Sequence, residues 1–369
     1  MQITCEQPEL LKGVQAVSRA ISTRTTMPIL SNILLETTKD GVKLVATDLE
    51  LGIQTMIPAV VKQGGAITLS ARLFTEIVSN LPGAPVQLRV EEGSTQAEIQ
   101  CEETTFEILG LPATDFPFMP EPDATVVITL EAGLLRGMVR QTAFAVSTDE
   151  TRPFLTGVFF STEDRTVRLV ATDGGRLALR TASLGQQAKQ KFAVIVPAKT
   201  MQELARALGG VTGDVTVALA ENNLVFSLPE LRLVSRLIAG QFPNYQQVIP
   251  QGHKQKLRLQ TERFLRAVRR AAITARDSAN VVRLAAKGTE LVITSNTPEV
   301  GKAMEKVPVQ VEGDAVEVAF NARYLMECLT ILETDEITFE LTGPLSPGAI
   351  RPLDQQEYIY VLAPVRVYA

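Results

Sequence analysis

The pentapeptide LVATD occurs twice in this chain, at residues 44–48 and again at residues 169–173. An identical run of five residues is improbable by chance, so the repeat indicates internal duplication. A third version, LVITS, lies at residues 291–295. The copies are separated by roughly 122 to 129 residues, which is too long for one unit of a solenoid and predicts three complete small domains.

Each copy repeats the same order of elements around this motif. A strand and a helix open the copy, and a second strand and an amphipathic helix follow the motif. The opening segments are ITCEQPELLKGVQAVSRA (3–20), VVITLEAGLLRGMVRQTAFA (126–145) and KLRLQTERFLRAVRRAAITA (256–275), and the later segments are AITLSARLFTEIVSNL (66–81), AVIVPAKTMQELARAL (193–208) and AVEVAFNARYLMECLTIL (315–332). A strand of alternating apolar and polar residues then begins in each copy, which places one of its faces on a core.

Two proline-containing segments mark the ends of the first and second copies. They read FPFMPEPDA (116–124) and FPNYQQVIPQGHK (242–254), and their Phe-Pro starts favour extended linkers. We therefore expect domains at residues 1–122, 123–250 and 251–369. The predicted fold class is α+β, with three tandem copies of a domain that has two helices and about eight strands.

The bulk composition is that of a globular intracellular protein. The apolar fraction is 45%, no run of eighteen apolar residues exists, and the N-terminus lacks the basic and apolar regions of a secretion signal. Cys5, Cys101 and Cys328 are scattered and form no CxxC pair, so we interpret them as small buried residues in a reducing cytosol. The expected location is the cytoplasm.

The formal net charge is −5, yet the predicted helices carry mostly basic residues. These are Lys12, Arg19, Arg136, Arg140, Arg263, Arg266, Arg269, Arg270 and Arg276 on the opening helices, and Arg72, Lys199, Arg206 and Arg323 on the later ones. Solvated helix faces with i,i+4 ion pairs would explain any single helix. Because the bias recurs in all three copies, we favour a localised surface for phosphate, without base readout and with steep salt dependence.

Catalytic and metal-binding motifs are missing. The sequence has no GxxxxGK[ST] loop, no GxSxG and no HExxH, and its only histidine, His253, lies in the second linker. Asp48 and Asp173 end the two LVATD copies, where aspartate most often makes a local turn hydrogen bond. We therefore expect no catalytic residue, no metal and no cofactor. A metal-dependent nuclease that uses these two carboxylates and a plain DNA-binding regulator remain as alternative functions.

Five stretches together carry a resemblance that covers the whole chain. They are MPILSNILLE (27–36), LVATDLEL (44–51), LVATDGGRLAL (169–179), GQFPNYQQVIP (240–250) and YIYVLAPVRV (358–367). With these stretches the chain resembles the bacterial sliding clamps, the beta subunits of DNA polymerase III.

The resemblance implies a non-catalytic processivity factor. Two chains would join head to tail into a six-domain ring, which encircles duplex DNA without reading its sequence. The implied partners are the polymerase III catalytic subunit, the clamp loader, and other polymerases and repair proteins that carry short peptide motifs. No membrane partner is implied, and the cytoplasmic location would be nucleoid-associated.

The resemblance also implies three groups of site residues. Arg24 and Arg72 match DNA-contacting arginines of the family, and they join Lys12, Arg19, Arg136, Arg140, Lys199, Arg206, Arg266 and Arg270 as expected DNA-binding residues. Phe106 and Ile108 of one chain would meet Ile273 of the other, although ordinary core positions explain each residue equally well. A partner-peptide pocket between the second and third domains would comprise Leu155, Thr172, Gly174, Gly175, Arg176, Leu177, Pro243, Val248, Val361, Leu362, Ala363, Pro364, Val365 and Arg366.

The chain also departs from the family pattern. Gly175 stands where better-known clamps often have histidine, and Ala363 and Val365 replace methionines. Methionine adapts to varied partners, so its absence bears on the preferred peptide motif. Pro153 and Phe154 stand where some relatives carry a pair of tyrosines that touch DNA.

Overall fold

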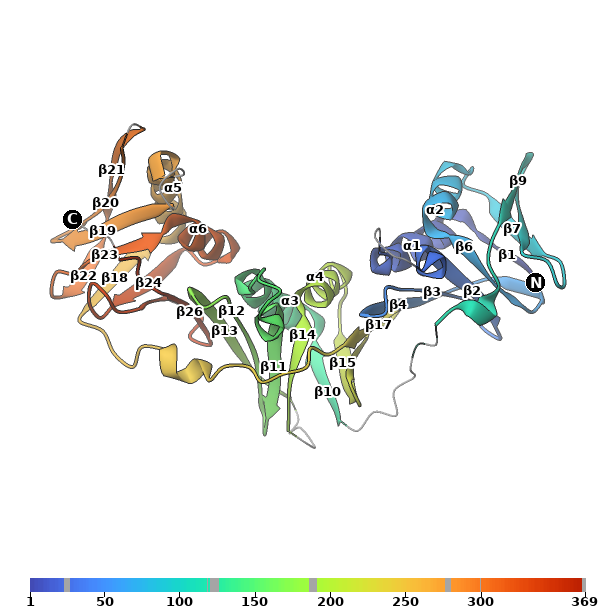
Figure 1. The fold of residues 1–369 in the computed structure, drawn as a ribbon, viewed down its shortest axis with the longest axis horizontal. Coiled ribbons are helices and arrows are strands. Elements are labelled where there is room, and N and C mark those ends of the chain that lie inside the picture. Colours follow the sequence, from blue (N-terminus) through green and yellow to red (C-terminus); the bar gives the residue numbers. More distant parts are fainter. Residues whose placement is uncertain are drawn as a thin grey trace. The chain divides into compact units, whose positions relative to one another are not determined.

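The computed structural model describes residues 1–22, 27–117, 119, 126–185, 191–275, 280–298 and 300–366 (Figure 1). The chain divides into two compact units. Unit 1 comprises Met1–Leu135 and Lys199–Leu237, and unit 2 comprises Arg136–Ala198 and Ile238–Ala369. The two units are described separately below.

Unit 1 contains a five-stranded and an eight-stranded antiparallel sheet, with strand orders β5-β1-β7-β8-β9 and β10-β15-β16-β17-β4-β3-β2-β6. The elements of the first copy are β1 (Gln2–Glu6), α1 (Gln7–Val17), β2 (Asn32–Thr38), β3 (Gly41–Thr47), β4 (Leu51–Ile57), β5 (Val60–Gln63), β6 (Ala66–Ser70), α2 (Ala71–Asn80), β7 (Pro85–Val90), β8 (Gln96–Cys101) and β9 (Thr104–Leu109). The second copy contributes β10 (Val126–Glu131), β15 (Asp214–Ala220), β16 (Asn223–Ser227), β17 (Leu231–Arg236) and nearly all of α4 (Ala198–Ala207).

Unit 2 contains a nine-stranded and a four-stranded antiparallel sheet, with orders β14-β11-β12-β13-β26-β25-β24-β18-β22 and β21-β20-β19-β23. From the second copy come most of α3 (Ala132–Thr142) and β11 (Gly157–Glu163), β12 (Thr166–Thr172), β13 (Arg176–Ser183) and β14 (Phe192–Pro197). The third copy supplies β18 (Gln255–Gln260), α5 (Thr261–Ala271), β19 (Val281–Lys287), β20 (Glu290–Thr297), β21 (Gly301–Pro308), β22 (Gln310–Gly313), β23 (Glu317–Asn321), α6 (Ala322–Ile331), β24 (Glu336–Leu341), β25 (Gly348–Pro352) and β26 (Tyr358–Leu362).

Both large sheets join strands from successive copies. β4 of the first copy pairs with β17 of the second, and β13 of the second copy pairs with β26 of the third. The middle copy is therefore shared between the two units. This division follows strand pairing rather than the repeat, so the boundaries at residues 122/123 and 250/251 stay a prediction.

Polar side chains cap the starts of α3 and α6. The carboxylate of Glu131 accepts hydrogen bonds from the backbone N–H groups of Gly133 (2.9 Å) and Leu134 (2.6 Å) at the start of α3. Asn321 does the same at the start of α6, where its Oδ1 accepts from Arg323 N–H at 2.9 Å. Such caps satisfy donors that the first helical turn leaves unpaired.

α5 has one apolar face and one basic face. Its buried residues include Phe264, Leu265, Ala267, Val268 and Ala271, while the intervening arginines are exposed. α5 packs against α6 and against β20 and β21 (Figure 1). The helix thus covers the core of the third copy with one side and presents cations on the other.

The cysteines behave as the composition suggested. Cys5, Cys101 and Cys328 are all buried and free. Burial raises the pKa of the Cys5 thiol to about 12, so this thiol stays protonated at neutral pH. Among the described residues, no helix is long and apolar enough to cross a membrane.

Replacement of Phe339 by alanine should weaken the third copy. Its ring is fully buried and lies 5.4 Å from the ring of Phe320 and 6.3 Å from that of Phe264. We expect Phe339→Ala to lower the free energy of unfolding by about 3–5 kcal/mol, measured by hydrogen exchange of the β24 amides. Val300→Ala, at a position 49% exposed in the same copy, should change it little. An equal loss in both variants would contradict this assignment of the core.

Candidate partner surface and basic helices

The two LVATD motifs end in turns that their aspartates hold together. Asp48 Oδ1 accepts hydrogen bonds from the backbone N–H groups of Glu50 (3.0 Å) and Leu51 (2.7 Å). Asp173 Oδ1 likewise accepts from Gly175 (2.8 Å) and Arg176 (3.0 Å). The predicted local turn role of both carboxylates is confirmed. Among the described residues, no three His, Cys, Asp or Glu side chains gather as a metal site requires.

The second turn differs from the first in carrying two glycines and an arginine. Gly174 has φ +93°, which L residues with a side chain rarely adopt. A Cβ on Gly175 would lie 3.1 Å from a ring carbon of Tyr324, so a larger residue here would require that ring to move. Glycine rather than histidine at position 175 is therefore consistent with the close approach of the Tyr324 ring. Thr172 Oγ1 donates a hydrogen bond to the carbonyl of Arg176 and closes the turn.

Arg176 is buried and fully engaged. Its Nε donates to Asp173 Oδ2 at 3.0 Å, one Nη pairs with Glu327, and the other donates to the carbonyl of Phe144 at 2.9 Å. The guanidinium carbon lies 4.4 Å from the ring centroid of Tyr324. These contacts compensate the cost of burying the charge and tie the turn to α6.

Burial alone would raise the pKa of the Glu327 carboxyl. Hydrogen bonds from Arg176 and Arg323 outweigh burial and hold this pKa below its ordinary value. The carboxyl is therefore ionised at neutral pH and keeps Arg176 paired.

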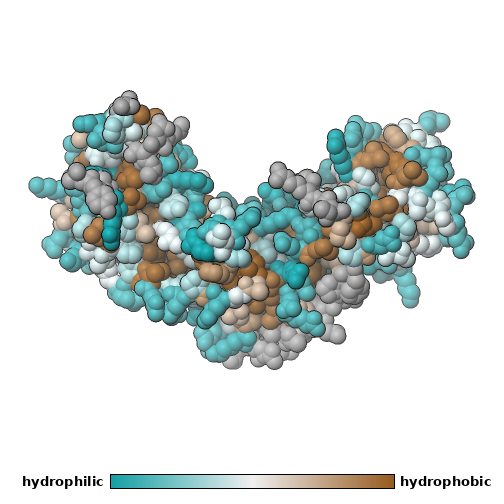
Figure 2. Space-filling model, in the orientation of Figure 1, coloured by the Kyte–Doolittle hydropathy of each residue, from teal (hydrophilic) through white to brown (hydrophobic). Residues whose placement is uncertain are grey.

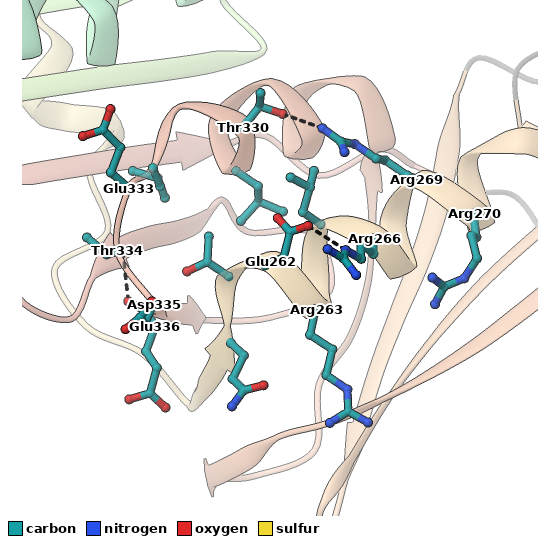
Figure 3. A pocket seen from close by; sticks show the side chains of 15 residues that line it. Glu262, Arg263, Arg266, Arg269, Arg270, Thr330, Glu333, Thr334, Asp335 and Glu336 are labelled. Carbon is teal, nitrogen blue, oxygen red and sulfur yellow. Dashed lines mark hydrogen bonds and ion pairs between the residues drawn. The ribbon is translucent and has the colours of Figure 1, made fainter.

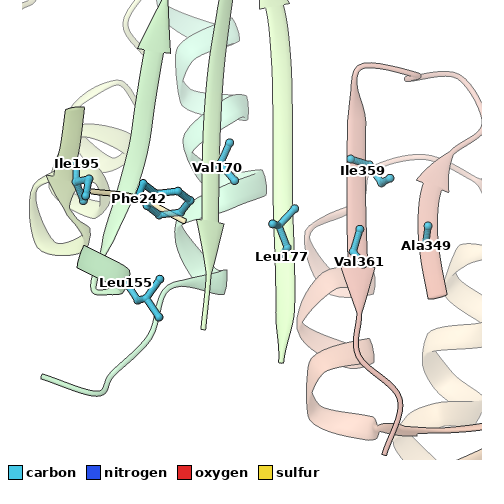
Figure 4. Packing of buried hydrophobic residues seen from close by; sticks show 8 residues of the cluster. All are labelled: Leu155, Val170, Leu177, Ile195, Phe242, Ala349, Ile359 and Val361. Atoms are coloured by element: carbon cyan, nitrogen blue, oxygen red, sulfur yellow. The ribbon is translucent and has the colours of Figure 1, made fainter. Parts of the chain in front are cut away.

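An apolar cluster joins the second and third copies on one face of the nine-stranded sheet (Figure 4). We call it the junction cluster. It consists of Leu155, Val170, Leu177, Ile195, Phe242, Ala349, Ile359 and Val361. Leu177 of β13 pairs with Val361 of β26, and both lie near the centre of the junction cluster. Figure 2 shows apolar side chains gathered on the visible face of unit 2 around these strands.

The structure brings only part of the predicted pocket into this cluster. Leu155, Leu177 and Val361 belong to it. Arg176 and Leu362 also pair with each other, next to the pair Leu177 and Val361. Because successive side chains of a strand point to opposite faces, the side chains of Arg176 and Leu362 lie on the other face of the sheet. Both are buried on that face.

Beyond the second motif turn, the other predicted pocket residues lie outside the cluster, in the segment that follows β26 and in the second linker. Ala363 donates its N–H to the carbonyl of Gly175 (2.9 Å), and Val365 donates to the carbonyl of Ala319 (2.8 Å). Ala363 is exposed, and Pro364 and Val365 are half-buried. The remaining three are exposed, and they are Pro243, Val248 and Arg366.

Sequence reasoning missed several members of the junction cluster. Phe242 stacks on Phe159 at 4.9 Å between ring centroids, and the ring of Tyr245 lies 6.0 Å from that of Phe159. Phe242 and Tyr245 belong to the stretch FPNYQQVIP, so the motif itself was the available signal. Val170, Ile195, Ala349 and Ile359 are ordinary strand residues, and only strand pairing reveals their role.

The basic residues predicted to contact DNA are exposed wherever the structure describes them. Arg24 lies outside the described residues. Lys12, Arg19, Arg140, Lys199, Arg206, Arg266 and Arg270 each form an ion pair with an acidic side chain. Arg72 and Arg136 pair with no acidic residue in the described part of the chain. The cationic ends themselves are exposed to solvent, so a phosphate can compete for them with their acidic partners.

An open groove of about 1030 Å³ runs beside α5 (Figure 3). Arg263, Arg266, Arg269 and Arg270 line it from the helix, and Glu333, Thr334, Asp335 and Glu336 line it from the segment after α6. Arg270 is held by both oxygens of Glu305 (2.9 and 2.6 Å), and Arg266 by Glu262 at i−4 (2.6 Å). α5 therefore has an i,i+4 ion pair, as expected of a solvated helix, and also an excess of arginines.

The predicted subunit-contact residues have different surroundings. β9 is an edge strand of the five-stranded sheet. Phe106 on β9 is 37% exposed, whereas Ile108 on the same strand is buried in its own domain. Ile273 follows α5 and is 59% exposed. Two of the three side chains are thus open to a partner.

Comparisons with known proteins cover the whole chain. Sequence models of the DNA polymerase III beta subunit match in tandem: the N-terminal domain at residues 1–120, the central domain at 129–244 and the C-terminal domain at 246–366. The beta sliding clamp of Bacillus subtilis is 35% identical, and that of Synechococcus elongatus 34% identical, each with 100% of both chains covered.

Solved structures give the same result. The crystal structure of the Bacillus subtilis DNA polymerase sliding clamp superposes with a TM-score of 0.96 at 35% identity. The sliding clamp (DNA polymerase III subunit beta) of Bartonella birtlesii bound to griselimycin superposes with a TM-score of 0.93 at 34% identity. Each comparison covers 100% of both chains. This chain, with its three tandem clamp domains, therefore belongs to the beta sliding clamp family and is the non-catalytic processivity subunit of a DNA polymerase III.

Proposed function

We propose that two copies of this chain close head to tail into a ring around duplex DNA and tether the replicative polymerase to it. The ring would have six domains, with the boundaries 1–122, 123–250 and 251–369 in each chain. The observation that carries the proposal is the exposure of cations on helices of all three copies in a chain of net charge −5. Cations exposed to solvent suit contacts that exchange readily between phosphates and so permit sliding.

Edge pairing supports the proposed closure of the ring. An unpaired edge strand such as β9 exposes backbone donors and acceptors that a second chain can satisfy. Phe106 on this edge and Ile273 after α5 are apolar and exposed, as a subunit contact requires. Ile108 would contribute through the backbone of its strand, because its side chain is already buried.

Topological linkage is the property that tests the ring. After loading onto a nicked circular plasmid by the cognate clamp loader, the chain should stay bound through a high-salt wash and be lost after one restriction cut. Ile273→Asp should reduce the dimer to monomers in light scattering and abolish retention, because it places a charge in an apolar contact. Retention that falls with salt equally on circular and linear DNA would show binding by charge alone.

We also infer that the surface over the junction cluster receives short peptide motifs of the polymerase III catalytic subunit, the clamp loader and repair proteins. Its apolar side chains come from two copies and meet at a strand junction, and polar backbone groups lie at its end near Gly175 and Ala363. Recognition of a peptide by an apolar surface with a few fixed polar groups is a common mode. Compared with methionine, Ala363 and Val365 offer a smaller and less adaptable edge.

A charge at the centre of the cluster should block the partner. Leu177→Asp is expected to weaken binding of the purified polymerase III catalytic subunit by at least about tenfold in surface plasmon resonance. Val248→Asp, at a position 49% exposed, gives a second variant that leaves the buried cluster intact and should weaken binding less. Val300→Asp, on the tip between β20 and β21, is the matched control and should bind as the unmodified chain does. Unchanged binding in Leu177→Asp would refute this assignment.

The Arg176–Glu327 pair should make unfolding of unit 2 sensitive to acid. The folded-state pKa of Glu327 is depressed, so its stabilisation is present above the unfolded-state pKa and is lost as pH falls through the folded-state value. We expect Glu327→Gln to cost about 1–3 kcal/mol at pH 7 in denaturant unfolding, and the difference to shrink between about pH 5 and pH 3.

The matched control for this prediction is Glu317→Gln. Glu317 is exposed, and within the described part of the chain its one ion pair is with Arg283 at 3.9 Å, so its loss should be nearly neutral across the same pH range. A constant difference between Glu327→Gln and the unmodified chain from pH 7 to about pH 3 would contradict the role of the ionised carboxylate.

A further inference from the structure

The strand junction inside unit 1 has the same register as the one that carries the junction cluster. In unit 2, Leu177 of β13 pairs with Val361 of β26. In unit 1, Gly52 of β4 pairs with Val234 of β17. Each motif turn leads into the strand at the same spacing, so Gly52 is the counterpart of Leu177 and Val234 is the counterpart of Val361.

The neighbouring strands extend this equivalence. Thr47 pairs with Gly52 as Thr172 pairs with Leu177. On the other side, the register partner of Val234 is Val225, and the register partner of Val361 is Ala349. Because register fixes the face of each side chain, the same sheet face is apolar at both junctions.

One residue of the first linker covers this face in unit 1. Met119 packs on the cluster formed by Ala218, Val225 and Val234. A Cβ on Gly52 would lie 2.5 Å from Met119 Cε and 2.7 Å from its Sδ. The Met119 side chain therefore occupies the space above the strand that a side chain at position 52 would need.

The two linkers carry different residues at the position that packs on the strand junction. Met119 lies three residues after Phe116 in the first linker, and Tyr245 lies three residues after Phe242 in the second. Tyr245 packs beside the junction cluster, with its ring 6.0 Å from that of Phe159. Leu177 fills the centre of that cluster, whereas Gly52 leaves the equivalent centre open to Met119.

We propose that the β4–β17 junction is a second copy of the partner surface, which the chain closes with its own Met119. Each chain then offers one peptide site although the repeat builds the surface twice. A linker residue held beside the surface acts at an effective concentration of millimolar order, which free partner peptides rarely reach. The unbranched thioether of methionine suits this irregular gap. The identification of the surface as a peptide site rests on the proposed function, whereas its closure by Met119 does not.

Methionine oxidation tests the closure directly. The full chain is exposed to hydrogen peroxide, and sulfoxide at each methionine is measured by mass spectrometry. Met119 should oxidise several-fold more slowly than Met304, which is 68% exposed. Gly52→Leu places the counterpart of Leu177 in the gap and should bring Met119 to the rate of Met304. Equal rates in the unmodified chain, or an unchanged Met119 rate in a folded Gly52→Leu chain, would overturn the closure.

A rescue experiment tests the second surface as a peptide site. Binding of the polymerase III catalytic subunit is compared between Leu177→Asp alone and Leu177→Asp combined with Gly52→Leu and Met119→Ser. The combined variant should bind at least about tenfold more tightly than Leu177→Asp alone. No recovery would overturn the equivalence of the two surfaces. Loss of the proposed function would look different, because the unmodified chain would then fail to bind, or Leu177→Asp would have no effect.

Discussion

Strand pairing between successive copies is the interaction on which the rest of the structure depends. The hydrogen bonds between β4 and β17, and between β13 and β26, turn the sheets of separate copies into two large antiparallel sheets. They satisfy backbone groups that would otherwise be unpaired edges. Their register also decides which side chains meet: Leu177 and Val361 on one face, and Arg176 and Leu362 on the other.

The buried arginine of the second motif turn and the exposed arginines of α5 are paired in different ways. The buried Arg176 is fixed by Asp173, Glu327 and the carbonyl of Phe144, because an unpaired charge in the interior would be costly. The exposed arginines of α5 are held only by side chains that water also reaches. The fixed pairing of Arg176 suits the peptide contact that we propose, and the solvent-accessible cations on the helices suit the proposed sliding contact with DNA.

The repeat, the fold class and the local role of Asp48 and Asp173 could be predicted from the sequence, because motif spacing and turn chemistry are local properties. The apolar face of α5 could be predicted for the same reason, since its residues follow the helical period. The composition of the junction cluster could not: Val170, Ile195, Ala349 and Ile359 are distant in sequence, and only strand order and register bring them together. The resemblance to a family supplied Leu155, Leu177 and Val361, but it did not separate them from Arg176 and Leu362 on the opposite face.

The sequence by itself determined that the chain carries three clamp domains with basic helices and no catalytic motif, since repetition, periodicity and charge are written along the chain. Only the tertiary structure decided how the two strand junctions differ. Gly52 and Leu177 occupy equivalent positions, yet one admits Met119 from a linker and the other fills its own space. This difference depends on the volume above a strand, which arises only when segments far apart in sequence pack together.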